Sequence, residues 1–260
     1  MQAVPHCADI HSGGDVSVSV VFRAARALLV PTTCSVLLSC GDAPSPPSPR
    51  EHAAGCEAPA EVAARPRTIE QSVALANALP KPLTLPCYLE ALGRPLQLHA
   101  TLSEFSAQPA RGEENPRLFV VYEPLIMTVV PVGIGHHLLE FGELRPEHRS
   151  LKGELRFPLA QQVEPGEVYR HTLFNENLTG CAFCHADEVL DSSVPGGLAY
   201  VSQALRPRDG QRVSLDVLRA ELDACDTRAE PDRCAMLDAL FGWGETLDWE
   251  FPVDMATFGN

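Results

Sequence analysis

Residues 117–141, RLFVVYEPLIMTVVPVGIGHHLLEF, decide the fold. They contain three apolar runs rich in β-branched and aromatic residues, at 117–122, 125–130 and 137–141. A Glu-Pro pair separates the first run from the second, and a Pro-Val-Gly break precedes the third. Short apolar runs between turn-forming residues are typical of consecutive antiparallel strands. The stretch therefore predicts three neighbouring strands.

Segments on both sides of this stretch extend the pattern. Residues 96–102 and 151–157 alternate apolar and other side chains, which indicates strands with one buried face. Turn signals recur at about ten-residue spacing, as in antiparallel sandwiches. Residues 167–174 and 198–201 are further strand candidates, and the tail at 247–253 alternates and is expected to return to the sheet. We therefore expect an α+β protein built on an antiparallel, jelly-roll-like β-sandwich.

Three other segments have the spacing of helices. Residues 69–79 carry apolar side chains at helical intervals and are followed by prolines that end the helix. Residues 213–224 also carry apolar side chains at helical intervals, with Ser214 as a plausible N-cap. Residues 231–241 open with Pro231 in the first turn. The sequence therefore predicts one helix before the strands and a C-terminal α-helical segment.

Composition excludes several classes of function. The chain has 260 residues, of which 20 are basic and 34 acidic, for a formal net charge of −14. Nucleic-acid binders normally present a basic patch, and proteins that dock on anionic lipid present a basic surface, so neither class fits. Nine cysteines are more than a reduced cytosolic protein usually carries. Because nine is odd, at least one cysteine has a fate other than pairing within the chain.

The N-terminal region has the order of an export signal. Arg23 and Arg26 precede an apolar stretch at 27–39 that is too short to span a membrane. The stretch ends in LLSC at 37–40, which resembles the lipobox of bacterial lipoproteins. This resemblance implies that Cys40 becomes the first residue of the mature chain and carries the lipid. The alternative is a buried N-terminal segment that holds an ordinary core cysteine.

These features divide the chain into three parts. Residues 1–40 form the signal and lipobox segment, and translation is expected to start near residue 20, because residues 1–19 are surplus to such a signal. Residues 41–67 are rich in Pro, Ala and Ser, which predicts a disordered tether. Residues 68–260 form a β-rich globular domain.

One motif carries chemistry, the sequence CAFCH at 181–185. Two cysteines three positions apart can form thioethers with the two vinyl groups of a haem, and the histidine that follows can bind the iron. Over these five residues the chain resembles c-type cytochromes. The resemblance implies one haem c, attached through Cys181 and Cys184, with His185 as the proximal iron ligand. The motif follows strands rather than a single helix, so the fold of the small helical cytochromes is not expected.

Two other uses of the motif remain open. Cys181 and Cys184 could form a disulfide with each other. A zinc site could instead use both cysteines and His185, with Cys225 or Cys234 as a further ligand.

The second axial iron ligand is less well defined by the sequence. The two candidates are Met236, on a predicted helix after the motif, and His171, which precedes the motif and could fold back over it. Met236 could equally be an ordinary core methionine. An iron with five ligands, open to a small molecule, is a third possibility. Further candidates after Cys40 are Met127, Met255, His99, His136, His137 and His148.

The remaining cysteines are even in number. Lipidation and haem attachment leave Cys56, Cys87, Cys225 and Cys234. We expect Cys225 to pair with Cys234 between two helices, and Cys56 with Cys87, although the sequence allows three pairings. The count is also satisfied by three disulfides without a haem.

These observations predict a lipid-anchored c-type haem protein on the periplasmic side of a bacterial membrane, more specifically the outer membrane. It would transfer single electrons or sense a small ligand, and its acidity would favour a basic redox partner. The alternative is a disulfide-stabilised binding or structural lipoprotein without haem. The nucleophile-elbow, P-loop and Rossmann patterns do not occur, so we do not expect an enzyme. If Asp187 and Glu188 lie near the haem, they should lower its potential.

Overall fold

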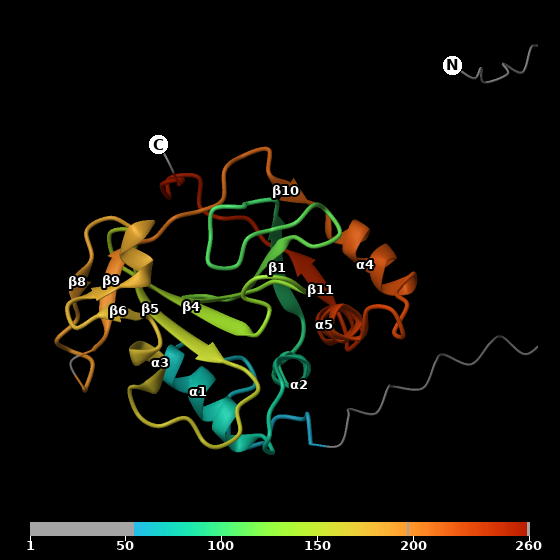
Figure 1. Cartoon of the computed structure of the whole chain (residues 1–260), viewed down its shortest axis with the longest axis horizontal. Coiled ribbons are helices and arrows are strands. Elements are labelled where there is room, and N and C mark those ends of the chain that lie inside the picture. The colour runs from blue at the N-terminus through green and yellow to red at the C-terminus, as the bar shows by residue number, and fades with distance from the viewer. Residues whose placement is uncertain (1–54, 197, 259–260) are drawn as a thin grey trace, which may run out of the picture. The chain divides into compact units, whose positions relative to one another are not determined.

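The computed structural model describes residues 55–196 and 198–258 (Figure 1). The predicted signal segment, the start near residue 20, the lipobox and Cys40 all lie outside the described residues. Among the described residues, no helix is both long enough and apolar enough to cross a membrane.

Five antiparallel strands form the centre of the molecule, and each pairs with the next along the chain. They are β1 (Leu96–Thr101), β2 (Arg117–Tyr122), β3 (Leu125–Val129), β4 (Leu138–Arg145) and β5 (Arg149–Arg156). The predicted Glu-Pro break is the tight connection between β2 and β3, since Tyr122 lies opposite Leu125. The five predicted strands are confirmed.

Shorter strands extend this sheet at both edges. The order is β10-β1-β2-β3-β4-β5-β9-β8, and β11 also pairs with β1, in parallel. The bounds are β8 (Val189–Leu190), β9 (Tyr200–Gln203), β10 (Arg212–Val213) and β11 (Thr246–Asp248). A separate pair consists of β6 (Leu173–Asn175) and β7 (Leu178–Thr179). As predicted, the tail returns to the sheet.

Helices cover one face of the central strands and bury the main core (Figure 1). They are α1 (Ile69–Ala78), α2 (Leu85–Glu90), α3 (Glu167–Arg170), α4 (Leu215–Asp223) and α5 (Pro231–Phe241). Alternate residues of the strands, such as Leu98, Leu118 and Leu139, pack against them. Ser214 caps α4, because its hydroxyl accepts a hydrogen bond from the backbone N–H of Asp216. The expected α+β class with C-terminal helices is confirmed.

The strand predicted at 167–174 is wrong over its first half. These residues form the short helix α3, and only Leu173 and Phe174 enter a strand. Gly166 adopts a left-handed backbone with φ of 76°, which turns the chain before a strand can continue. Val168 and Tyr169 are adjacent yet both buried, which a strand with one covered face does not allow.

The folded part begins before residue 68. Cys56 is buried and bonded to Cys87 of α2. Ala58 and Val62 pack against the main core, so the last part of the predicted tether belongs to the domain. The first part of the tether lies outside the described residues.

Candidate functional site

A cavity of about 380 Å³ lies on the other face of the sheet, away from the main core. Strands β2 to β5 form its floor through side chains that alternate with the core residues, and the chain at 103–107, 171–185, 204–211 and 251–258 forms its walls. In Figure 1 these loops lie on the side of the central strands opposite α1, α2 and α3. His185, Cys181 and Cys184 line the cavity, so the CAFCH motif faces it.

A tight turn holds the CAFCH motif in place. The turn is a 3₁₀ helix at Gly180–Phe183, and the carbonyl of Cys181 accepts hydrogen bonds from the backbone N–H groups of Cys184 at 3.1 Å and His185 at 2.9 Å. Thr179 caps the turn, because its hydroxyl accepts a hydrogen bond from the N–H of Cys181 at 3.1 Å. The three reactive side chains therefore project from a single turn of backbone.

The Glu188 carboxylate holds this turn through its capping residue, Thr179. It accepts hydrogen bonds from both the N–H and the hydroxyl of Thr179. Glu188 was expected to be a charge that could lower a haem potential, and its carboxylate is engaged in holding this loop.

His185 is held as a neutral imidazole with one nitrogen free. Its Nδ1 lies 2.8 Å from the carbonyl of Gln203, which can only accept, so the ring proton is on Nδ1. Burial, reinforced by the charges of Lys152 and Arg117, lowers the pKa of His185 to about 3. Within the described residues, Nε2 has no hydrogen-bond partner. A neutral imidazole oriented by a carbonyl at Nδ1 is the form that binds a metal through Nε2.

The two cysteines of the motif are free thiols that differ in surroundings. Cys184 is exposed, whereas Cys181 is partly buried and lines the cavity. Burial raises the pKa of Cys181 to about 11, and the positive charge of Lys152 offsets only part of this effect. The alternative disulfide between them does not form in this structure.

The further ligands proposed for a zinc site, Cys225 and Cys234, are not free to bind a metal. Cys225 and Cys234 are bonded to each other, as are Cys56 and Cys87, so both expected pairings are present. In the part of the chain that the structure describes, no three His, Cys, Asp or Glu side chains converge as a metal site would need.

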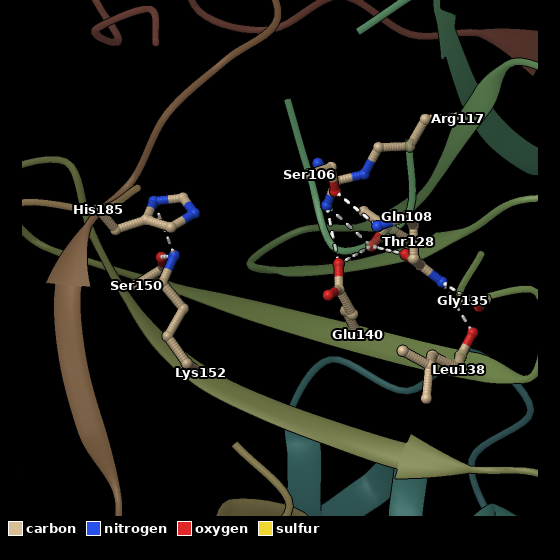
Figure 2. Close-up of polar contacts among 10 residues, drawn as sticks. All are labelled: Ser106, Gln108, Arg117, Thr128, Gly135, Leu138, Glu140, Ser150, Lys152 and His185. Carbon is tan, nitrogen blue, oxygen red and sulfur yellow. Dashed lines mark hydrogen bonds and ion pairs between the residues drawn. The ribbon is translucent and has the colours of Figure 1, made fainter. Parts of the chain in front are cut away.

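Lys152 lies on β5 with its ammonium inside the cavity wall. Its residue is only 7% exposed, and Nζ donates to the hydroxyl of Ser150 at 2.6 Å and lies 3.4 Å from Nδ1 of His185 (Figure 2). Burial lowers the pKa of Lys152 to about 8. Sequence reasoning missed this residue, although its position in the alternating segment at 151–157 places it on the face opposite Leu151 and Leu155.

A second polar group faces Lys152 and His185 across the cavity (Figure 2). The Glu140 carboxylate accepts a hydrogen bond from Arg117 at 2.9 Å. The single hydroxyl proton of Thr128 is shared between Gln108 Oε1 at 2.8 Å and the Glu140 carboxylate at 3.1 Å. Gln108 receives a hydrogen bond at Oε1, and its Nε2 donates to the carbonyl of Leu138 at 2.9 Å. This network attaches the loop that follows β1 to strands β3 and β4 through Gln108. No sequence motif marks this network, and its strand residues are visible in the sequence only as polar residues at alternate positions.

The two candidates for the second axial ligand are placed differently. His171 lines the cavity, but its Nδ1 lies 3.1 Å from the carbonyl of Glu154 and its Nε2 lies 3.6 Å from the Glu167 carboxylate. Met236 is buried in the main core and does not line the cavity, so the structure does not bring it to His185. Met255, one of the further candidates, does line the cavity.

Exposed aromatic rings flank the motif. Phe174 and Phe183 meet edge to face with centroids 5.1 Å apart, and they are 65% and 66% exposed. Phe183 lies between the two cysteines, and Phe174 lines the cavity. Large apolar side chains left in solvent beside a polar cavity are typical of a binding surface.

Comparisons with known protein families, with curated proteins and with solved structures find no match to this chain.

Proposed function

We propose that this chain is a c-type haem protein, in which Cys181 and Cys184 attach the haem and His185 binds its iron. One observation carries the proposal. Every other cysteine of the described residues is in a disulfide, while the two thiols of the motif are free and lie beside a neutral imidazole with an available Nε2. Thioether attachment needs free thiols, and iron ligation needs that nitrogen.

The surroundings fit such a group. A porphyrin is a flat apolar ring with charged carboxylates at one edge. The cavity combines aromatic and aliphatic side chains, including Phe119, Ile126 and Phe251, with the cations Arg117 and Lys152. The exposed rings of Phe174 and Phe183 supply further apolar surface next to the thiols.

When bound, the haem would supply an iron that changes between the ferrous and ferric states. The chain contributes the rest. The turn at 180–183 fixes the two attachment points, and the Gln203 carbonyl fixes the orientation of the His185 ring. Within the described residues, no hydrogen bond joins a thiol of the motif to His185 or Lys152 as a nucleophile would be joined to its base, which favours transfer of single electrons or sensing of a small ligand.

The proposal includes the cellular setting. Lipidation at Cys40 and residence on the periplasmic side of a bacterial membrane, more specifically the outer membrane, would put the chain where haem c is attached. Two disulfides agree with an oxidising compartment. With a net charge of −14, a basic protein is the expected redox partner.

The alternative is a binding lipoprotein that holds no haem. The observation in its favour is the cavity itself, whose volume of about 380 Å³ suits a small organic molecule without any covalent bond.

The test is expression together with a haem-attachment system. We expect a red protein whose haem stays with the polypeptide through acid-acetone extraction, and which a C181A/C184A variant lacks. The matched control is C56A/C87A, which removes the same number of cysteines and should keep its haem. A colourless wild-type protein, or haem that extracts freely, would overturn the proposal and favour the binding lipoprotein.

A further inference from the structure

Lys152 occupies an unusual place for a charged residue. On β5 the residues Leu151, Gly153 and Leu155 face the main core, while Ser150, Lys152 and Glu154 face the cavity. The floor of the cavity is buried, so the ammonium of Lys152 is withdrawn from water. Withdrawing a charge from water is unfavourable unless other charges compensate for it.

Compensation for Lys152 is weak. Among the described residues, no carboxylate lies within 4.0 Å of its Nζ, and its direct partner is the neutral hydroxyl of Ser150. The acidic groups that act on it are the thiol of Cys181 and, after it, the carboxylates of Glu140 and Glu188. Cys181 would carry no charge as a thioether, Glu140 is paired with Arg117, and Glu188 accepts hydrogen bonds from Thr179. The positive charge of Lys152 therefore acts electrostatically on the neighbouring group.

The adjoining group is the ring of His185. The ammonium lies 3.4 Å from Nδ1, and Nδ1 already donates its proton to Gln203. A protonated Nδ1 cannot accept a hydrogen bond from Lys152, so the contact is electrostatic. The charge stands at the Nδ1 side of the ring and draws electron density away from Nε2, the nitrogen that is free to bind a metal.

We infer that Lys152 is a positioning residue that raises the reduction potential of the iron bound by His185, an inference that rests on the proposed function. Ferric iron carries one more positive charge than ferrous iron, so a fixed cation nearby disfavours the ferric state. It also makes the imidazole a weaker donor, which again favours ferrous iron. On reduction, a single-electron carrier protein would supply one electron to the bound iron, no bond of the chain would break, and Lys152 would keep its proton.

The test is the midpoint potential of the haem-loaded protein, followed through its absorption bands in an electrochemical cell. Lys152→Met removes the charge and keeps an apolar stem of similar length. Such a replacement of a buried charge is often neutral or stabilising, so the variant is expected to fold. Lys152→Gln is a second neutral variant, and Lys152→Arg retains the charge. The matched control is Arg228→Gln, the same loss of charge at an exposed turn between α4 and α5.

We expect both neutral variants to shift the midpoint downward, Lys152→Arg to remain closer to the wild type, and Arg228→Gln to leave the midpoint unchanged. A loaded Lys152→Met or Lys152→Gln protein with the wild-type midpoint would overturn the inference and leave the proposed function intact. An equal shift in Arg228→Gln would also overturn it, because total charge would then explain the effect. Failure of the wild type to attach haem would overturn both.

Discussion

At the scale of single residues, the chemistry of the site follows from what each polar atom touches. Nζ of Lys152 lies 3.4 Å from Nδ1 of His185. Lys152 is buried and His185 is partly buried, and the charge of Lys152 reinforces the neutral state of His185. The two thiols of the motif are only three positions apart, yet one is exposed and the other partly buried. Differences of this kind should be measurable in the chain without haem.

The first prediction concerns those thiols. In the haem-free protein near pH 8, Cys184 should be alkylated by iodoacetamide well before Cys181. The pKa of Cys181, raised by burial from 9.0 to about 11, lowers its thiolate fraction by roughly a hundredfold. Peptide mapping by mass spectrometry would follow each site. In denaturant the two rates should converge, and equal rates in the folded protein would contradict the assigned burial.

The second prediction concerns His99, which packs against the rings of Phe119 and Phe251 and donates from Nδ1 to the carbonyl of Trp249. Burial lowers its pKa below the unfolded value of 6.5. The unfolded state then binds a proton before the folded state does. Stability from the neutral ring is thus fully present above pH 6.5 and is lost as the pH falls below that value.

Urea unfolding at a series of pH values would check this expectation. A His99→Gln variant keeps a hydrogen-bond donor and does not titrate, so its stability should fall less steeply below pH 6.5 than that of the wild type. Parallel curves for the two proteins would show that His99 does not have the lowered pKa.

At the scale of elements, the strands and long helices could be predicted because their patterns are local. Alternation at 96–102 and 151–157 marked β1 and β5, and Ser214 and Pro231 marked the starts of α4 and α5. Helix α3 was missed because one residue, Gly166, redirects the chain, and a glycine alone does not reveal its backbone angle in a sequence.

The third prediction concerns the connection between α4 and α5. The Cys225–Cys234 disulfide closes a loop with a sequence separation of 9 and joins the end of one helix to the start of the next. Replacing both residues by serine should lower the free energy of unfolding by about 2–3 kcal/mol. Chemical denaturation would measure this loss. Haem attachment by the variant should persist, since neither cysteine lines the cavity.

At the scale of the whole molecule, the sheet separates two functions. One face packs against helices and stabilises the fold, while the other face holds the cavity, the motif and the network around Glu140. CAFCH alone indicated the part of the chain at which the candidate site lies. Its partners Lys152, Arg117 and Gln203 could not be predicted, because only the folded loops determine which polar strand residues are covered and which remain in water.

The fourth prediction follows from total charge and rests on the proposed function. A net charge of −14 should attract cationic redox reagents and repel anionic ones. Electron exchange with hexaammineruthenium should therefore slow as salt is added, and exchange with ferricyanide should accelerate. Stopped-flow absorbance at several ionic strengths would measure both rates. The same salt dependence for both reagents would contradict electrostatic steering by the protein.

The pairing of β11 with β1 affects the order in which parts of the domain can fold. Strand β1 stands near the start of the described domain and cannot gain this neighbour until residues 246–248 have been delivered. Contacts between distant parts of a chain form late, because the intervening loop must first be closed. Cys181 and Cys184 come earlier in the chain than β11 and than the wall of the cavity at 251–258. If haem is attached to these thiols as proposed, the attaching enzyme can reach them before β11 has paired with β1 and before this wall of the cavity has formed.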